Sequence, residues 1–128
     1  MKEFIVSLSQ KYHIGIFTAG TSSYVKYIIN SFFPELKNLF KFVFSREDCL
    51  QQDTDLYIKN FNYLLKKNNY KYKGLSKYKN IYLVDDNPQN IIPQSSGIRI
   101  KPFLSDNYEE EKENRYLENF IINCINFK

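Results

Sequence analysis

The stretch of sequence that decides the fold is HIGIFTAG, residues 13–20. Its apolar first half predicts a short strand, which the small residues Ala19 and Gly20 close with a turn. The hydroxyl residues 21–23 are candidates for a helix N-cap, and apolar residues then recur at helical spacing up to Pro34. The stretch therefore predicts a strand, a loop and a helix in succession.

Outward from this unit, hydrophobic patterns and turn signals predict the same alternation along the rest of the chain. Strands that alternate with helices imply a mostly parallel sheet in an α/β layer fold. The first predicted elements are the end of an amphipathic helix at 2–10, a brief strand at 42–44, a second helix at 56–67, and a buried strand from Asn80 that ends in Asp85 and Asp86. A short strand at 98–100 and a C-terminal helix follow. Ser105 or Asp106 caps this last helix, and its apolar face holds Tyr116, Leu117, Phe120, Ile121 and Cys124.

The length and composition of the chain favour one soluble globular domain over residues 1–128. A chain of this length can bury a substantial core, and a hydrophobic content of 43% argues against overall disorder. No apolar run approaches the roughly 20 residues of a membrane span, and the first residues show neither a secretory nor a transit pattern. We therefore expect no membrane partner and a nuclear or cytoplasmic location.

The net charge of +4 is spread along the chain and favours anionic partners only weakly. Residues 68–79 interleave lysines with tyrosines, in a segment that fits either an inserted loop or a helix end. RNA binding by such a segment would need its aromatic rings on a defined stacking platform. Because Lys, Asn and Tyr are abundant throughout the chain, we interpret the segment as a solvated loop and expect no nucleic-acid partner.

Two segments place reactive groups at the carboxyl ends of predicted strands, where α/β folds collect their chemistry. Thr18, Ala19 and Gly20 offer a hydroxyl and accessible backbone N–H groups ahead of a helix, which suits a phosphate. Thr18 also fits a purely structural cap. Asp85 and Asp86 end an apolar strand, where a carboxylate can ligate a hard cation such as Mg²⁺, although acidic residues are also common in turns.

Six segments occur in the order seen in one known protein family. They are Phe17-Thr18-Ala19, Tyr24, Ser45-Arg46-Glu47-Asp48-Cys49, Tyr57-Ile58-Lys59, Leu83-Val84-Asp85-Asp86-Asn87-Pro88 and residues 97–103. With these segments, the chain resembles the catalytic domain of the NLI-interacting-factor-like, or RNA polymerase II C-terminal-domain, phosphatases of the haloacid dehalogenase (HAD) superfamily. The resemblance runs from Phe4 to about Phe120. It implies a Rossmann-like, HAD-type, mostly parallel sheet with flanking helices.

The resemblance also implies a Mg²⁺-dependent aspartyl-phosphate mechanism on phosphoserine or phosphothreonine in proteins. Thr18 matches the hydroxyl residue that hydrogen-bonds the transferring phosphoryl group. Lys59 matches the lysine that neutralises phosphate charge, with Lys73 as a rival that has similar local sequence. Asp85 and Asp86 match the metal-binding motif, in which the second position reaches the metal and the first organises it. A hydroxyl, an ammonium and carboxylate-held Mg²⁺ together suit phosphoryl transfer.

The chain departs from the family at the nucleophile. The family carries an Asp-x-Asp-x-Thr (or Val) motif upstream of the Phe-Thr-Ala strand, and nothing of the kind precedes His13. The motif Asp53-Thr54-Asp55 follows a polar stretch instead of an apolar strand, so we interpret it as a loop. The missing strand would be central, between the strands that end at Thr18 and Asp85, so we expect the chain by itself to be inactive.

Three explanations of this departure remain open. We favour a truncated gene model or a piece of a longer protein, whose upstream part holds the nucleophile. The second is a catalytically dead module that binds peptides, like the mitochondrial import receptor relatives of the family. The third is an unrelated small α/β domain, which could include RNA binding through the basic loop. The expected partner is a phosphoprotein, such as the RNA polymerase II C-terminal tail, while the substrate's identity and the oligomeric state stay open.

Overall fold

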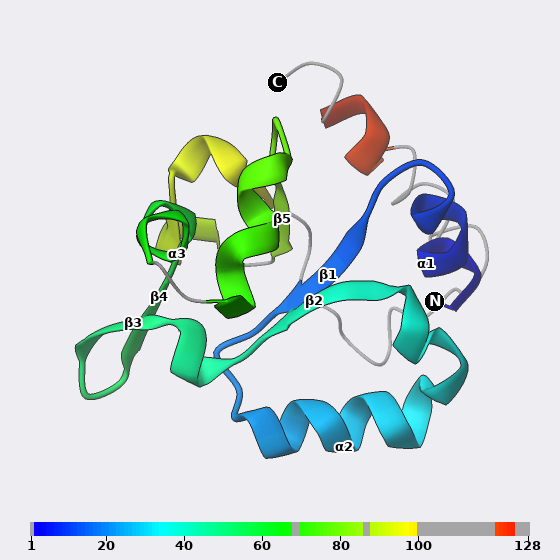
Figure 1. Cartoon of the computed structure of the whole chain (residues 1–128), viewed down its shortest axis with the longest axis horizontal. Coiled ribbons are helices and arrows are strands. Elements are labelled where there is room, and N and C mark those ends of the chain that lie inside the picture. Colours follow the sequence, from blue (N-terminus) through cyan, green and yellow to red (C-terminus); the bar gives the residue numbers. More distant parts are fainter. Residues whose placement is uncertain (1, 68–69, 86–87, 100–119, 125–128) are drawn as a thin grey trace.

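The computed structural model shows the chain as short helices and small sheets (Figure 1). The residues that it describes are 2–67, 70–85, 88–99 and 120–124. Within these ranges, no helix is both long and apolar enough to cross a membrane. Helices and strands alternate along these ranges, which confirms the mixed α/β class.

The N-terminal unit has the predicted order. Helix α1 (Lys2–Ser9) leads into strand β1 (Ile14–Phe17), and helix α2 (Ser22–Phe32) follows after a turn. Thr21 is the N-cap of α2, because its side-chain oxygen accepts a hydrogen bond from the Tyr24 N–H at 3.3 Å. The local signals of an apolar run, a hydroxyl cap and a following proline were therefore sufficient to predict this part of the fold.

Strand β2 (Phe40–Phe44) follows the 3₁₀ helix η1 (Pro34–Leu39) and pairs with β1 in parallel. The strand predicted at 42–44 is therefore confirmed, and it begins two residues earlier. The register places Phe17 opposite Phe44, and the Thr18 N–H donates to the Phe44 carbonyl at 3.0 Å. The two strands consequently end side by side.

The helix predicted over 56–67 is wrong in its first half. Residues in this stretch form strand β4 (Leu56–Asn60) and only then the short helix α3 (Phe61–Lys66). Strand β3 (Leu50–Asp53) pairs with β4 in an antiparallel hairpin, which a single-segment helical pattern could not reveal. The Asn60 side chain caps α3 by accepting the Tyr63 N–H at 3.0 Å, so the helix can begin only after the strand ends.

The C-terminal half adds three short strands: β5 (Leu83–Asp85), β6 (Ile91–Ile92) and β7 (Gly97–Arg99). The strand predicted from Asn80 starts later than expected, and β6 was not predicted. The basic segment at 68–79 contains the 3₁₀ helix η3 (Tyr70–Lys77).

A C-terminal helix was also predicted from the sequence. Residues 120–124 are helical, whereas the predicted caps Ser105 and Asp106 and the face residues Tyr116 and Leu117 lie outside the described residues.

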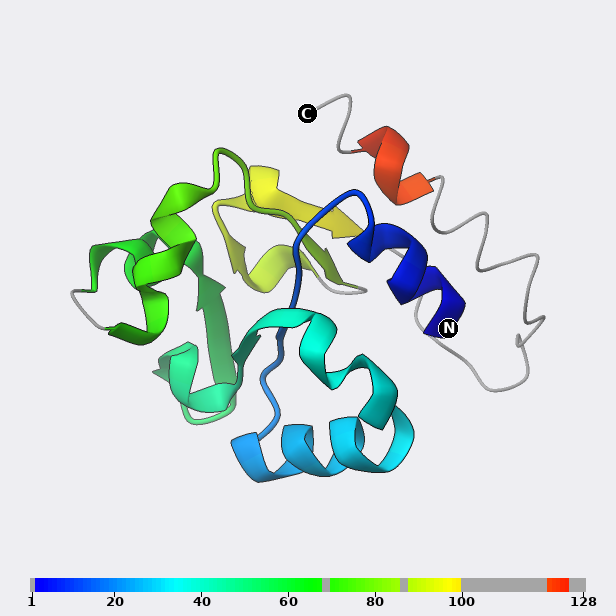
Figure 2. The same cartoon turned by 45° about the vertical axis from the view of Figure 1, so that its right-hand side comes forward.

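The described strands form three small sheets. β1 pairs with β2, β4 lies between β3 and β6, and β5 pairs with β7, and every pairing except the β3–β4 hairpin is parallel. In Figures 1 and 2, α2 lies on one side of the β1–β2 pair, and α3 and η3 lie on the other. One Rossmann-like sheet with an absent central strand stays a prediction.

An aromatic cluster packs these sheets together. Phe17 contacts the rings of Phe44 and Phe61 edge to face, with centroid distances of 5.5 and 5.7 Å. The buried cluster also contains Leu64, Tyr72, Leu75 and Ile91, and the partly buried Ile81 and Leu83 pack against it. The core therefore draws side chains from all three sheets and from the two helical segments α3 and η3.

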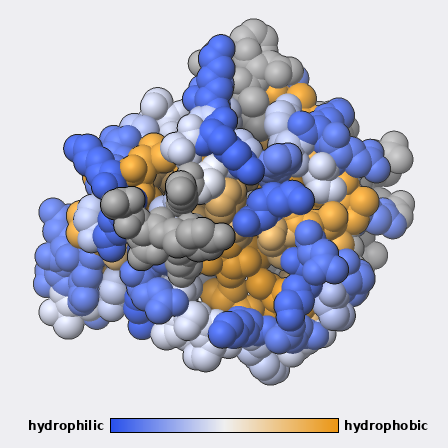
Figure 3. Space-filling model, in the orientation of Figure 1, coloured by the Kyte–Doolittle hydropathy of each residue, from blue (hydrophilic) through white to orange (hydrophobic). Residues whose placement is uncertain are grey.

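Apolar surface remains on one face of the molecule. Figure 3 shows hydrophobic side chains between α2 and β2, bordered by hydrophilic ones. Phe32 of α2 and Val43 of β2 are 54% and 38% exposed. Such surface residues contribute little to the core, so they provide controls for substitutions inside it.

We predict that Phe44→Ala lowers the free energy of unfolding by about 3–5 kcal/mol, because it opens a cavity in the aromatic cluster. Phe32→Ala is the matched control and should cost less than about 1 kcal/mol, because its ring is mostly exposed. Urea denaturation of the two variants measures both values. Equal losses would contradict the assignment of the core.

Candidate functional site

The turn after β1 is held by its own threonine. The Gly20 N–H donates to the Thr18 side-chain oxygen at 3.1 Å, so Thr18 has the structural role that its position allowed. Among the described residues, no acceptor takes the hydroxyl hydrogen of Thr18, which leaves that O–H able to donate to a ligand. A Cβ atom at Gly20 would lie 3.2 Å from the Tyr24 ring, so only glycine fits the turn without displacing this ring.

Arg46 fastens this turn to the segment after β2. Its Nε donates to the Ala19 carbonyl at 2.8 Å, and its backbone N–H donates to the Gly20 carbonyl at 2.9 Å. Its guanidinium lies 4.8 Å from the ring centre of Tyr57 in β4. The sequence pattern predicts no separate role for Arg46, because contacts across 27 positions leave no local signal.

The central charged feature of the site is an ion pair between two sheets. Lys59 Nζ lies 2.8 Å from Asp85 Oδ2, and the two side chains are only 15% and 16% exposed. Lys59 belongs to β4, where it pairs with Ile91 of β6, whereas Asp85 is the last residue of β5. A partly buried pair of this kind is weakly screened by solvent, so each charge depends on the other.

Cys49 packs against the turn after β1. Its Sγ is 3.8 Å from the Thr18 carbonyl oxygen and 3.7 Å from the Ser45 carbonyl oxygen. Burial raises the pKa of the thiol, and the positive charge of Lys59 offsets part of that rise. Cys49 is therefore a neutral packing group near pH 7 that contacts the turn and lies within electrostatic range of Lys59.

A buried carboxylate supports the segment that carries Arg46 and Cys49. Asp48 is 2% exposed, and it accepts the Ser45 N–H at 2.8 Å and the Tyr72 hydroxyl at 2.5 Å. Burial and the hydrogen bond to this carboxylate raise the pKa of Tyr72. The contact joins the 3₁₀ helix η2 (Arg46–Asp48) to η3, and it leaves the Tyr72 ring buried.

The structure places the predicted site residues in two groups. Thr18, Ala19 and Gly20 form the turn at the end of β1, and Lys59 with Asp85 forms the neighbouring ion pair. Asp86 lies outside the described residues.

Lys73, the alternative to Lys59, and Asp53, of the Asp-x-Asp motif in the chain, lie in other segments than the ion pair. Lys73 belongs to η3, but its side chain lies outside what the structure describes. Asp53 is exposed at the turn end of the β3–β4 hairpin, where its Oδ1 accepts the Thr54 N–H at 2.7 Å. Lys59 lies three residues beyond Leu56, the hairpin partner of Asp53, so Asp53 is remote from the ion pair along the strand.

The described residues provide few side chains that could bind a hard cation such as Mg²⁺. Within the described residues, no group of three His, Cys, Asp or Glu side chains could hold a metal ion. Mg²⁺ is often held by one or two carboxylates together with water and substrate phosphate. Asp85 meets that minimal requirement, since it is a carboxylate at the end of strand β5.

A family model described as NLI interacting factor-like phosphatase matches residues 1–127 of the chain. The match covers the turn, the Arg46 segment, the ion pair and all of the described strands. No curated protein matches the chain significantly.

We predict that Lys59 and Asp85 behave as a coupled pair in a double-mutant cycle. Lys59→Met and Asp85→Asn should each cost about 1–2 kcal/mol of unfolding free energy, because each leaves the other charge partly buried and unpaired. The double variant should cost about 1 kcal/mol less than the sum of the two single changes. Lys26→Met, at an exposed position of α2, is the control and should be nearly neutral. Additive losses in urea denaturation would show that the pair is not coupled.

We also predict that Tyr72 makes the protein sensitive to alkali. The raised pKa means that the folded state holds the phenol proton more tightly than the unfolded state does. Stability from this group is therefore complete below the unfolded pKa of about 10 and falls as the pH rises above it. Tyr72→Phe should lose about 1–2 kcal/mol at pH 7 but show a shallower decline above pH 10. The exposed Tyr27→Phe should decline as the parent chain does, and identical slopes in all three proteins would contradict the role of Tyr72.

Proposed function

This chain belongs to the NLI interacting factor-like phosphatase family, and we propose that it is a Mg²⁺-dependent phosphoserine/phosphothreonine protein phosphatase domain. The observation that carries the proposal is the partly buried Lys59–Asp85 pair, together with the Thr18–Gly20 turn at the end of β1. By resemblance, its substrate is a phosphoprotein, with the RNA polymerase II C-terminal tail as the first candidate. A nuclear or cytoplasmic location belongs to the same proposal.

The contacts of the site residues support a specific role for each of them in phosphate binding. The Thr18 hydroxyl can donate its hydrogen to a phosphoryl oxygen while its own oxygen holds the turn. Ala19 and Gly20 keep the turn free of bulky side chains. The backbone N–H groups of Thr18 and Gly20 are already hydrogen-bonded, so among the described residues the N–H of Ala19 is the backbone donor of this turn that a phosphate could use. Lys59 brings a partly buried positive charge, which is more effective there than in bulk water, and Asp85 orients it.

Asp85, together with Asp86 by sequence, would hold the Mg²⁺ ion. When bound, Mg²⁺ would neutralise phosphate charge and orient the phosphate oxygens. Asp85 would then share its carboxylate between the ion and Lys59, so we propose that this ion pair is the resting form of the metal ligand. Lys59 remains in place to contact phosphate when the ion is present.

The proposed reaction needs a nucleophilic aspartate, which we assign to a segment upstream of Met1. Of the described strands, β1 pairs only with β2, and β5 pairs only with β7. A central strand ending in Asp-x-Asp-x-Thr would run between β1 and β5 and complete one Rossmann-like sheet. The aspartyl-phosphate would then form close to Thr18 and Lys59. Asp53 and Asp55 do not fit this role, because they lie at the hairpin tip.

A second candidate function is phosphopeptide binding without catalysis. It is favoured by the partly buried ammonium of Lys59, which can bind an anion without any nucleophile once the anion displaces Asp85. RNA binding through the basic segment has no comparable support. Tyr72 is buried against Asp48, and Tyr78 packs edge to face on Phe42, so neither ring offers an open stacking face.

The test compares the 128-residue chain with a longer product of the same gene. With Mg²⁺ and an aryl phosphate, we expect no turnover by the 128-residue chain and clear turnover by the longer protein. In the longer protein, Thr18→Ala and Lys59→Ala should each lower kcat by about 10²-fold or more. Lys73→Ala and Asp53→Asn are matched controls and should leave kcat within about twofold, since neither belongs to the proposed site.

Two outcomes would contradict the proposal. Turnover by the 128-residue chain that disappears in Asp53→Asn would place the nucleophile in the hairpin. An inactive longer protein that still binds a phosphoserine peptide, and loses this binding in Lys59→Ala, would establish the binding module instead.

A further inference from the structure

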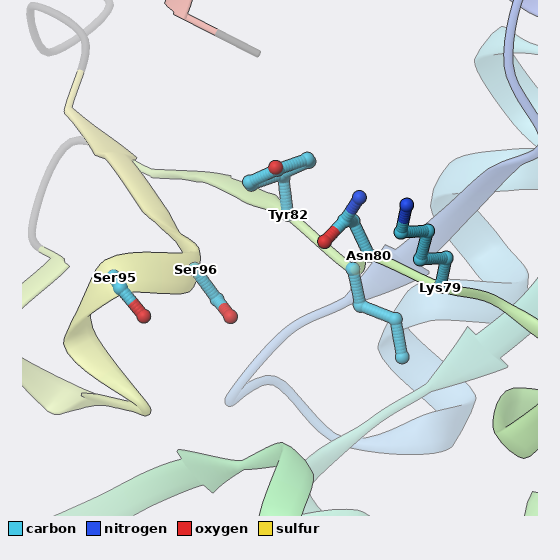
Figure 4. A pocket seen from close by; sticks show the side chains of 6 residues that line it. Lys79, Asn80, Tyr82, Ser95 and Ser96 are labelled. Atoms are coloured by element: carbon cyan, nitrogen blue, oxygen red, sulfur yellow. The ribbon is translucent and has the colours of Figure 1, made fainter. Parts of the chain in front are cut away.

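A polar pocket lies at the opposite end of β5 from the ion pair. It has a volume of about 300 Å³ and is lined by Lys79, Asn80, Ile81, Tyr82, Ser95 and Ser96. Figure 4 shows Ser95 and Ser96 on one side of the pocket and Lys79, Asn80 and Tyr82 on the other. Because β5 and β7 are parallel, both strands run away from this pocket and toward Asp85.

The walls of the pocket are anchored on both sides. Tyr78, directly before Lys79, bonds to His13 Nδ1 at 2.6 Å and packs edge to face on Phe42. Ile81 packs against the aromatic core cluster. Leu83 pairs with Gly97, so the preceding residues of the two strands lie next to each other. The backbone of both walls is therefore fixed by the fold, while the side chains of Lys79, Asn80 and Ser95 are exposed to solvent.

The opposite wall is formed by the 3₁₀ helix η5 (Gln94–Ser96). The Ser96 N–H donates to the Pro93 carbonyl at 3.0 Å, and the Gln94 amide donates to the Gln89 carbonyl at 3.2 Å. These local bonds hold the short helix that carries the two serines in its position.

Four of the polar side chains that line the pocket are available to a ligand. Within the described residues, the side chains of Lys79, Asn80, Tyr82 and Ser96 have no hydrogen-bond or ion-pair partner. The lining contains one cation and no carboxylate. An ammonium, an amide and hydroxyl groups without an acidic neighbour favour an anion over a cation or a neutral ligand.

The size of the pocket argues for more than a bare ion. A volume near 300 Å³ is at the lower end of small-molecule sites, and Ile81 adds an apolar surface to the lining. We propose that this pocket binds a small organic anion, with Lys79 on the anionic group and Ser96 and Asn80 on the polar body. The site is independent of the phosphatase proposal, because it lies at the other end of the strands.

The experiment uses the ¹⁵N-labelled 128-residue chain and follows backbone amide shifts by NMR. The probes are glycerol 3-phosphate as a phosphate monoester, succinate as a carboxylate, inorganic phosphate as a bare anion, and glycerol as the neutral control. We expect one of the two organic anions to shift the amides of Tyr82, Ser95 and Ser96 in a saturable way, and to bind more tightly than inorganic phosphate. The stronger of the two identifies the anionic group.

Matched variants separate this pocket from general surface charge. Lys79→Gln should weaken binding about tenfold, and Ser96→Ala should weaken it less. Lys77→Gln removes a nearby lysine outside the pocket and should leave affinity unchanged. Shifts at Ala19 and Gly20, if phosphate produces them, report the proposed phosphatase site and should persist in Lys79→Gln.

Three results would overturn the proposal. The first is the absence of saturable shifts at Tyr82, Ser95 and Ser96 with both organic anions. The second is equal weakening by Lys77→Gln and Lys79→Gln, which would indicate unspecific attraction to basic surface. The third is an equal response to glycerol, which would show that charge is not recognised. A dispersed spectrum of each variant establishes that it is folded.

Discussion

The edge-to-face packing of Phe17 against Phe44 and Phe61 is the interaction on which the site depends. Phe17 directly precedes Thr18, Phe44 directly precedes the segment that contains Arg46 and Cys49, and Phe61 follows Lys59 by two positions. Each core ring therefore holds one polar segment at the end of its strand. Because aromatic rings pack with limited freedom, the positions of the polar groups follow from the core.

Polar contacts then join the strand ends that the core has brought together. Arg46 bonds to the turn after β1, Cys49 touches the same turn, and Asp48 joins this segment to η3 through Tyr72. In the described part of the chain, no buried polar side-chain atom lacks a hydrogen-bond partner. Such satisfied networks are rigid, because breaking one bond would leave a desolvated group without a partner.

The two ends of β5 have different electrostatic properties. At its carboxyl end, the charge of Lys59 is balanced by Asp85 within a partly buried pair. At its amino end, the ammonium of Lys79 borders a pocket whose lining contains no acid. The first arrangement can exchange partners when a phosphate or a cation arrives, whereas the second offers uncompensated positive charge. The short strand thus connects a proposed reaction site with a proposed ligand site.

Local physics made part of this structure predictable. The apolar run of β1, the cap of α2 and the position of Asp85 at a strand end all follow from signals within a few residues. The order of six short segments was also sufficient to indicate the family, because those segments carry the polar groups of the strand ends.

Other features were decided only by the tertiary structure. Leu56–Asn60 is a strand because it pairs with β3 and β6, and partners elsewhere in the chain override the weak helical pattern of the segment. The bonds from Lys59 to Asp85 and from Tyr72 to Asp48 join positions 26 and 24 residues apart. The sequence by itself determined that Thr18 and Asp85 stand at the ends of strands. Only the packed core decided which polar groups meet, because pairing energies depend on distances that no local pattern encodes.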